Sequence, residues 1–469
     1  MRAKFEKFGL IGVGAILGIM LSLNYSAIAD KDAKTQLPLE DLRAFAEVFG
    51  KVKSDYVEPV EDKKLISEAI SGMLSGLDPH SAYLDEDAFK DLQAGTQGEF
   101  GGLGIEVGME DGFVKVVSPI EDTPAYKAGL KPGDLIIKLD ETPVKGMTLT
   151  EAVKLMRGKP DTKIVLTILR KGENKPIVVT LTRAIVKVQS VKSKPSVEPG
   201  YGYVRITQFQ EHTGADLAKA LKAMVDENKD GLKGVVLDLR NNPGGLLNAA
   251  VGVSAAFIPK GELVVYTEGR VPDAKMRLTA SPENYVRSGP AEDYIKGLPP
   301  ELKTVPMVVL INGGSASASE IVAGALQDHK RAIILGTQSF GKGSVQTILP
   351  MNNGTAIKLT TARYFTPNGR SIQAKGIVPD IQAEEATVNN AEQGMNFREA
   401  DLTRHLSNPR DGEKPSAPEQ PAKVIAPPAG DENDKSGDKN APMEPGTKSD
   451  YQFTQAMNLL KGLQILQKK

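Results

Sequence analysis

The 469-residue sequence predicts a mixed α/β (α+β) core with an inserted smaller domain, a helical N-terminal region and a flexible C-terminal linker plus helix. Two observations carry this prediction. Strands alternate with helices between residues 202 and 361, which favours a layered core with a largely parallel sheet. Short strands and glycine turns fill residues 100–182, which is typical of a separate small β-rich domain.

The composition excludes several kinds of chemistry. There are no cysteines, so disulfides, thiolate metal sites and cysteine nucleophiles are absent. Four histidines lie far apart in the sequence, and no HExxH motif occurs, so we expect no metal and no cofactor. The formal net charge of −1 gives no reason to expect nucleic acid as a partner.

Residues 1–29 have the features of an export signal. Basic residues precede an apolar run over residues 8–23, and Ala27-Ile28-Ala29 follows it. This order is typical of a secretory signal peptide. The alternative is an uncleaved inner-membrane anchor through residues 8–23. In both cases we expect an exported, periplasmic bacterial protein.

The N-terminal region, residues 30–95, is predicted to be helical. Apolar residues recur at three- and four-residue steps over residues 39–57, and a second helix is expected over residues 63–77. These helices either pack on their own domain or form a dimerisation arm. A homo-oligomer through the N- or C-terminal helices is therefore a candidate assembly.

Residues 96–185 resemble a PDZ domain. Gly102, Leu103, Gly104 and Ile105 form the Gly-Leu-Gly-Ile turn that opens the first core strand, and AGLKPGDLI follows in the middle of the domain. The resemblance implies that this turn binds the carboxylate of a peptide, while the next strand accepts the peptide by β-augmentation. Further candidate peptide-binding residues are on a predicted helix, namely Leu149 and Val153. A nucleotide-binding GxGxxG loop is excluded because Val107 occupies the third glycine position.

The predicted core occupies residues 186–384. Residues 385–448 are rich in Pro, Asn, Glu, Asp and Lys with few large apolar groups, so a disordered linker is expected. Residues 449–469 form an amphipathic helix that docks on the body or on a partner; its apolar positions are Phe453, Met457, Leu460, Leu463 and Leu466.

A serine lies at a predicted strand-to-helix turn in the core. The apolar run at residues 305–311 leads into Asn-Gly-Gly and a Ser/Ala tract, and helix-favouring residues begin at Ala318. Ser317 and Glu320 match a capping box, which is an ordinary structural role. The same context is that of a nucleophile elbow, where a serine hydroxyl is presented at the end of a sheet. The two roles are compatible because a helix N-terminus favours negative charge.

A lysine lies on a glycine-flanked loop after the next strand. Residues 336–342 match the first seven positions of a phosphate-binding P-loop, but Gly343 stands where Ser or Thr must hold magnesium. The following residues, 344–349, read as a strand where a P-loop needs a helix. Lys342 can instead act as a base if burial lowers its pKa. His329 lies about 18 Å along the helix from Ser317 and cannot serve.

Several long motifs together resemble the carboxy-terminal processing (tail-specific) proteases, over residues 39–381. They are SASASEIVAGALQD, GTQSFGKGSVQ, DLRNNPGG and LDPHSAYLD. In that family the serine and lysine are 25 positions apart, which selects Ser317 with Lys342. The resemblance also implies that Gln346 orients the lysine. It further implies that an oxyanion hole is formed by Gly244 or Gly245 with the N–H of Ala318. Asp328 matches a family position too, and we interpret it as structural.

The resemblance implies an exported serine endopeptidase that cleaves proteins near or from their C-terminus. Its substrates are expected to be proteins or peptides with apolar C-termini, captured by residues 96–185. An adaptor protein is a further candidate partner. The contrary hypothesis is a non-catalytic PDZ scaffold on a protease-like fold.

Overall fold

The computed structural model describes residues 38–120, 123–173, 175–286, 293–384, 398–409, 445–447 and 449–467. The predicted signal or anchor segment lies outside these residues. The chain divides into two compact units, Met1–Gly72 and Met73–Lys469. No helix among the described residues is long and apolar enough to cross a membrane.

The first unit contains helix α2 (Leu39–Asp55) and most of helix α3 (Asp62–Ser75). Helix α2 buries none of its side chains, and Leu42, Phe45 and Val48 are exposed. Helix α2 therefore lacks the buried face that a helical pair packed on its own domain would have. The dimerisation arm stays a prediction.

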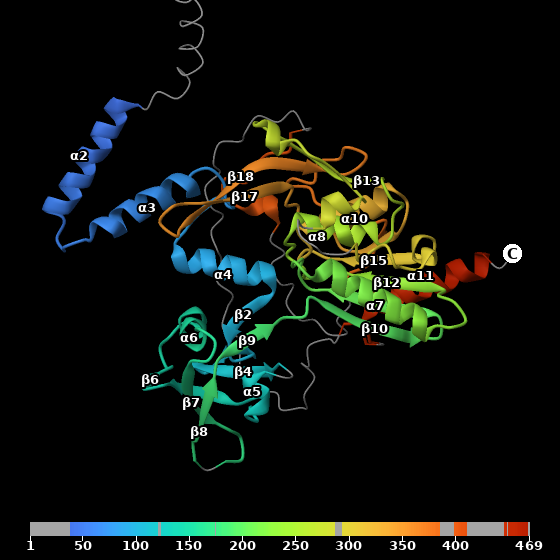
Figure 1. The fold of residues 1–469 in the computed structure, drawn as a ribbon, viewed down its shortest axis with the longest axis horizontal. Helices are drawn as coiled ribbons and strands as arrows, with labels where there is room; N and C mark the ends of the chain where they lie inside the picture. Colours follow the sequence, from blue (N-terminus) through green and yellow to red (C-terminus); the bar gives the residue numbers. More distant parts are fainter. Residues whose placement is uncertain are drawn as a thin grey trace, which may run out of the picture. The chain divides into compact units, whose positions relative to one another are not determined.

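A small β-rich domain is inserted between two short strands that pair with each other. The chain enters through β2 (Glu99–Gly102) and leaves through β9 (Ala184–Lys187), and these strands are antiparallel. Between them lies a sheet in the order β3-β4-β5-β7-β8, with β6 paired to β5 (Figure 1). Its strands are β3 (Ile105–Glu110), β4 (Phe113–Pro119), β5 (Leu135–Leu139), β6 (Thr142–Pro143), β7 (Lys163–Leu169) and β8 (Ile177–Thr182). Helices α5 (Pro124–Lys127) and α6 (Leu149–Met156) complete the domain.

The core contains a six-stranded sheet in the order β10-β11-β12-β15-β16-β19. All its pairings are parallel except that of β10 with β11, which confirms the predicted α/β class. The strands are β10 (Val191–Glu198), β11 (Tyr201–Ile206), β12 (Gly234–Asp238), β15 (Met307–Ile311), β16 (Ile333–Gly336) and β19 (Ile381–Gln382). The sheet is covered by α7 (Thr213–Glu227), α8 (Leu247–Ala255), α10 (Ala318–Asp328) and α11 (Tyr451–Gln467).

Side chains alternate between the two faces of this sheet, as strand geometry requires. Val235 and Leu237 join the cluster that contains residues of α7, α8 and α10, whereas Val236 joins the cluster that contains residues of α11. Both faces of the parallel strands are thus buried under helices. The C-terminal helix supplies the second cover, and it lies beside β12 in Figure 1. It therefore docks on the body of the chain.

A second sheet carries the lysine loop. It has the order β1-β18-β13-β14, and β17 also pairs with β18. Its strands are β1 (Ala82–Leu84), β13 (Leu263–Gly269), β14 (Arg277–Thr279), β17 (Ser344–Pro350) and β18 (Ala356–Phe365). Short elements join these layers: α4 (Glu86–Gln97), η2 (Pro272–Ala274), α9 (Pro282–Tyr285) and η3 (Pro300–Lys303).

Part of the predicted disordered linker is packed. Residues 398–409 include the turn η4 (Glu399–Asp401), and Glu399 is fully buried against His80, with both its oxygens 2.9 Å from Nε2. Gln373 donates a hydrogen bond to the same carboxylate. Composition missed this segment because contacts to distant residues, with no run of apolar residues, anchor it; the amide of Asn408 also donates to the carbonyls of Ser371 and Gln373.

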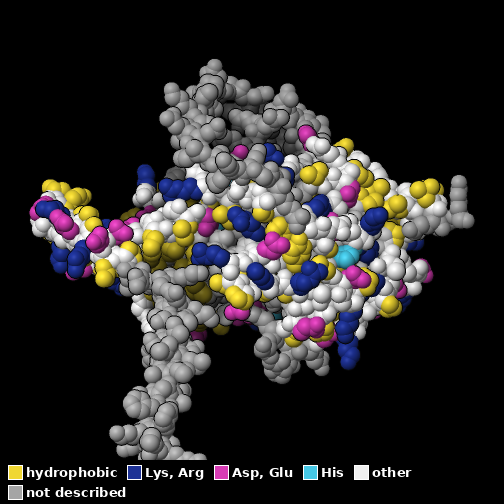
Figure 2. Space-filling model, turned by 90° about the horizontal axis from the view of Figure 1, so that it is seen from above, with side chains coloured by type: hydrophobic (Ala, Val, Ile, Leu, Met, Phe, Trp, Pro, Cys, Tyr) yellow, Lys and Arg dark blue, Asp and Glu magenta, His cyan; other side chains and the backbone are white. Residues whose placement is uncertain are grey.

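Charges are evenly distributed on the face seen in Figure 2. There, basic and acidic side chains of the described residues are interspersed and do not gather by sign. This distribution agrees with the formal net charge of −1.

Candidate active site

Ser317 occupies a strained turn between β15 and α10. Its φ and ψ are 53° and −111°, in a region that non-glycine residues rarely adopt. Such a conformation costs on the order of 1–3 kcal/mol and persists only where surrounding structure imposes it. The turn presents the serine directly before the first helical residue, which is the geometry of a nucleophile elbow.

The three serines of the SASAS tract differ in what their hydroxyl groups bind. Ser315 Oγ donates to the carbonyl of Leu239, and Ser319 Oγ donates to the carbonyl of Asn242. Both side chains are fully buried. Ser317 instead lines a cavity of about 700 Å³ beside the turn. The structure therefore distinguishes Ser317 from its neighbours by exposure to a cavity as well as by its position.

Lys342 lies on the loop before β17 and points into the same cavity. Burial first, and the nearby cation of Lys358 second, lower the pKa of its amine to about 8. No hydrogen bond reaches Nζ of Lys342 from any residue that the structure describes. The lysine amine is thus desolvated and available as a base near neutral pH.

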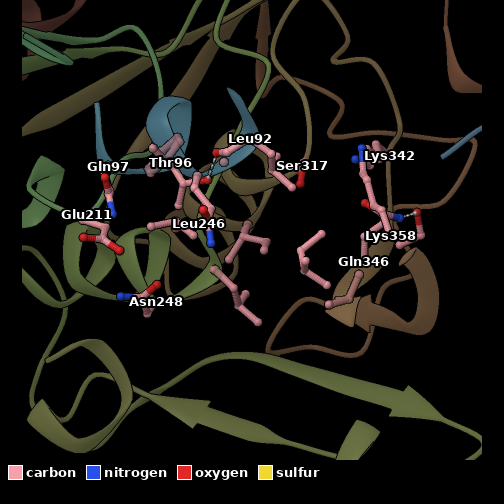
Figure 3. Close-up of a pocket in the computed structure, with 18 of the residues that line it drawn as sticks. Leu92, Thr96, Gln97, Glu211, Leu246, Asn248, Ser317, Lys342, Gln346 and Lys358 are labelled. Carbon is pink, nitrogen blue, oxygen red and sulfur yellow. Dashed lines mark hydrogen bonds between the residues drawn. The ribbon is translucent and has the colours of Figure 1, made fainter. Parts of the chain in front are cut away.

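Ser317 and Lys342 face the same cavity without touching. Figure 3 shows their side chains across the cavity from each other, and no hydrogen bond between them occurs in the described part of the chain. In unliganded enzymes catalytic hydrogen bonds are often long and shorten when substrate binds.

Glu320 connects the serine turn to the lysine loop. It is fully buried, and one oxygen accepts hydrogen bonds from the N–H groups of Ser317 (2.7 Å) and Lys342 (3.0 Å). The other oxygen accepts from Ser339 Oγ (2.6 Å) and the N–H of Gly341 (2.7 Å). Burial raises the pKa of Glu320 to about 8, although the four donors act in the opposite direction. The capping-box pattern indicated only the contact with Ser317.

Gln346 does not contact the lysine amine. Its Nε2 donates to Ser344 Oγ at 3.0 Å and to Thr360 Oγ1 at 3.2 Å. The pairing of β17 with β18 shifts register between Val345 and Gln346. Such a bulge changes the direction in which a side chain points. Gln346 still lines the cavity.

The loop of residues 240–245 brings its glycines against the serine turn. A Cβ on Gly244 would lie 2.8 Å from Cβ of Ser317, and one on Gly245 would lie 2.1 Å from the carbonyl oxygen of Phe209. Both have positive φ, 100° and 143°, so only glycine fits. The N–H of Gly244 donates to Asn242 Oδ1 at 2.9 Å. Within the described residues, the N–H groups of Gly245 and Ala318 have no acceptor.

Sequence reasoning missed several residues around the cavity. Its volume is about 700 Å³. Leu92, Thr96 and Gln97 line it from α4, and Lys358 lines it from β18. Tyr364, also in β18, is buried and its hydroxyl donates to the carbonyl of Lys342 and also hydrogen-bonds the Ser317 side chain. Helix α4 is an acidic, weakly apolar segment, so its sequence carried no signal of a site.

Asp328 lies away from this cavity at the end of α10. It accepts a hydrogen bond from the N–H of Asn368 at 2.8 Å and pairs with Arg370. These contacts tie a turn to the helix and favour the structural role. No group of three or more potential metal ligands occurs among the described residues.

The candidate peptide-binding residues of the inserted domain lie around an edge strand. Strand β3, which begins at Ile105, pairs only with β4 in its sheet. Gly104 has φ 77°, and Thr123 donates a hydrogen bond to its carbonyl. Leu103 is buried in the domain core, whereas Leu149 and Val153 on α6 are only partly buried beside it. The strand edge and α6 are thus available for an added peptide strand.

Family models match three parts of the chain. The model of peptidase family S41 matches residues 200–383, and the PDZ-domain model matches residues 101–181. The model of the N-terminal domain of the activating protease CtpB matches residues 12–88.

Known proteins match over most of their length. A carboxy-terminal-processing protease of Bartonella bacilliformis is 47% identical over 405 residues, covering 86% of this chain and 89% of that protein. The carboxy-terminal processing protease CtpA of Bacillus subtilis is 36% identical over 389 residues, covering 82% and 78%. A solved photosystem II D1 C-terminal processing protease is 32% identical, covers 70% and 84%, and has a TM-score of 0.41.

Proposed function

Because this chain belongs to the carboxy-terminal processing protease family and is a serine-type peptidase with a PDZ domain, we propose that Ser317 and Lys342 form its catalytic dyad. The observation that carries this proposal is the shared cavity, which is lined both by a serine on the strained turn after β15 and by a desolvated lysine on the loop between β16 and β17.

In the proposed mechanism, neutral Lys342 takes the proton of Ser317 as the hydroxyl attacks a peptide carbonyl. The leaving amine receives that proton, and water then resolves the acyl-enzyme. This step requires Nζ of Lys342 to come within about 3 Å of Ser317 Oγ. Gln346 helps to orient the lysine when that approach occurs. Its present partners, Ser344 and Thr360, lie beside the same cavity.

The oxyanion hole is proposed to be formed by the N–H groups of Gly245 and Ala318. Gly245 is chosen over Gly244 because the N–H of Gly244 already donates a hydrogen bond to Asn242 Oδ1 within the same turn. A helix N-terminus adds positive potential where the negative charge develops. Gly244 contributes by letting the loop approach Ser317, because a side chain there has no room.

The inserted domain is proposed to capture the apolar C-terminus of a substrate. Gly102, Leu103, Gly104 and Ile105 bind its carboxylate, and α6 contacts its apolar side chains. Export to the periplasm is proposed from the basic and apolar pattern of residues 1–29. The two relatives named above are bacterial proteins.

Changing Ser317 to Ala tests the dyad. Cleavage of an unfolded test protein such as casein and labelling by a fluorophosphonate are both expected to be lost. The matched control is Ser196→Ala, an exposed serine of β10 whose hydroxyl donates only to Glu198, and it is expected to keep both activities. Persistent cleavage by the Ser317→Ala variant would rule out Ser317 as nucleophile. If the wild-type chain neither cleaves casein nor reacts with the fluorophosphonate but still binds apolar peptides, the result would favour the non-catalytic PDZ scaffold.

A further inference from the structure

The residue directly before the C-terminal helix α11 is a buried acid next to the active-site loop. Arg240, the first residue of the 240–245 loop, is buried, and so is Asp450, which lies 210 positions later in sequence. The two side chains form a bidentate pair, with NH1 to Oδ1 at 2.9 Å and NH2 to Oδ2 at 2.5 Å. A buried ion pair with two hydrogen bonds fixes the positions of its two side chains more firmly than an exposed ion pair does.

All five donors of the Arg240 guanidinium are used. Besides the two bonds to Asp450, Nε and NH2 donate to Asp238 at 3.0 and 2.7 Å, and NH1 donates to Gln452 Oε1 at 3.0 Å. Tyr203 donates to the same Asp238 carboxylate. Burial acts to raise the pKa of Asp450, but the hydrogen bonds and charge of Arg240, together with the N–H groups of Gly446 and Phe453, hold that pKa below its usual value. The carboxylate is therefore ionised when the site works.

From Arg240 the loop runs directly to the glycines beside Ser317. Asn241 has φ 54° and exchanges hydrogen bonds with Asn312, both 2.9 Å long. The carbonyl of Asn242 accepts from the N–H of Ala316 and from Ser319 Oγ. The start of the loop is held by Arg240 and its middle by the serine turn. A displacement of Arg240 thus changes where the N–H of Gly245 points.

We propose that Asp450 is a positioning residue for catalysis. Through Arg240 it holds the 240–245 loop in the position where the N–H of Gly245 can stabilise the oxyanion. This inference rests on the proposed oxyanion hole. It makes the C-terminal segment, which follows a polar linker, a part of the catalytic core in addition to a cover for the sheet.

The test uses Asp450→Asn in the full-length chain. Asn keeps the capping contact that Asp450 accepts from the N–H of Phe453 but removes the charge that pairs with Arg240. We expect kcat to fall about 10- to 100-fold, since misplaced oxyanion donors cost on that order, while KM stays within about twofold. Affinity for a peptide aldehyde, which forms a tetrahedral adduct, is expected to fall with kcat.

The matched control removes packing from the same helix without touching the ion pair. Leu460 is fully buried against β12, so Leu460→Ala is expected to lower the melting temperature at least as much as Asp450→Asn and to leave kcat within about twofold. Should Asp450→Asn not fold, Gln452→Leu removes one acceptor of Arg240 and is expected to lower kcat by a smaller factor.

The proposal is overturned if Asp450→Asn keeps wild-type kcat, or if Leu460→Ala lowers kcat equally. The second outcome assigns the effect to helix docking alone. Ser317→Ala is measured in the same series. Activity that survives this change overturns the dyad, independently of whether Asp450 alters kcat.

Discussion

The carboxyl group of Glu320 accepts a hydrogen bond from the backbone N–H of Ser317 at 2.7 Å. The same oxygen binds the N–H of Lys342, so one buried side chain connects the end of the six-stranded sheet to the loop before β17. The proposed nucleophile lies on the turn after β15, and the proposed base lies on the loop that joins β16 to β17. Their relative position therefore depends on this shared acceptor.

Replacing Glu320 with Gln tests that dependence. In Gln, an amide NH2 group replaces one of the two carboxylate oxygens. That oxygen now accepts two hydrogen bonds, whereas the NH2 group only donates, so both hydrogen bonds would become unfavourable contacts between donors. We expect kcat/KM to fall at least 100-fold and stability to fall by about 2–3 kcal/mol. Urea unfolding and peptide cleavage measure the two effects. A variant with wild-type kcat/KM would contradict the connection.

The activity of the protease is expected to rise with pH. Lys342 acts as a base only when neutral, and its pKa of about 8 leaves roughly a tenth of the chains competent at pH 7 and roughly nine tenths at pH 9. The pH dependence of kcat/KM should therefore show an ascending limb near pH 8, the range in which Glu320, whose pKa burial also raises to about 8, titrates as well.

A matched control identifies the group that titrates. Lys303 also has a pKa lowered to about 8 by burial, but it donates to the carbonyls of Ala255 and Ile258, away from the cavity. Lys303→Met should leave the limb where it is. A limb that moves in this variant would exclude Lys342 as its source.

Lys358 is expected to set the position of that limb. Its cation lines the same cavity and lowers the pKa of Lys342, so Lys358→Gln should move the limb upward by a fraction of a pH unit. Activity at pH 7 should fall severalfold, while activity at pH 10 should return to that of the wild type. The same profile measured at high salt gives the check, because screening by salt weakens the effect of a charge that solvent reaches, and Lys358 is partly exposed. An unchanged profile would contradict this role.

Removing the Lys342 amine is expected to stabilise the protein. The folded-state pKa of about 8 lies below the ordinary 10.5, so the unfolded chain binds more protons between these values. The resulting penalty is fully present below pH 8 and disappears as pH rises through 10.5. Lys342→Met should thus abolish cleavage and raise the free energy of unfolding at pH 7 by up to about 3 kcal/mol. Equal stability of the two chains at pH 7 would contradict a desolvated amine.

The inserted domain is expected to govern substrate affinity. Val153→Glu places a charge on the half-buried face of α6, where an apolar substrate C-terminus would lie. We expect KM for a protein ending in apolar residues to rise about tenfold or more, with little change for a short internal peptide. Lys154→Glu, which alters an exposed neighbour paired with Asp87, is the control. Equal effects on both substrates would count against peptide capture.

Much of the core was predictable because its elements are locally determined. Alternating strands and helices indicated the parallel sheet, and the Asn-Gly-Gly turn before Ala318 indicated a strand-to-helix elbow. Residues 398–409 were predicted to be disordered, yet Glu399 is buried there against His80. Long-range contacts of individual polar side chains leave no periodic pattern, so composition alone cannot detect them.

By itself, the sequence determined the layered fold, the family and the candidate pair Ser317 and Lys342, because periodicity and motif spacing are properties of neighbouring residues. Only the tertiary structure decided which groups surround that pair. Glu320 connects the serine turn to the lysine loop, Lys358 lines the same cavity as Lys342, and Asp450 reaches Arg240 from the far end of the chain. These relationships depend on burial and on contacts between distant segments, which is why no local pattern contained them.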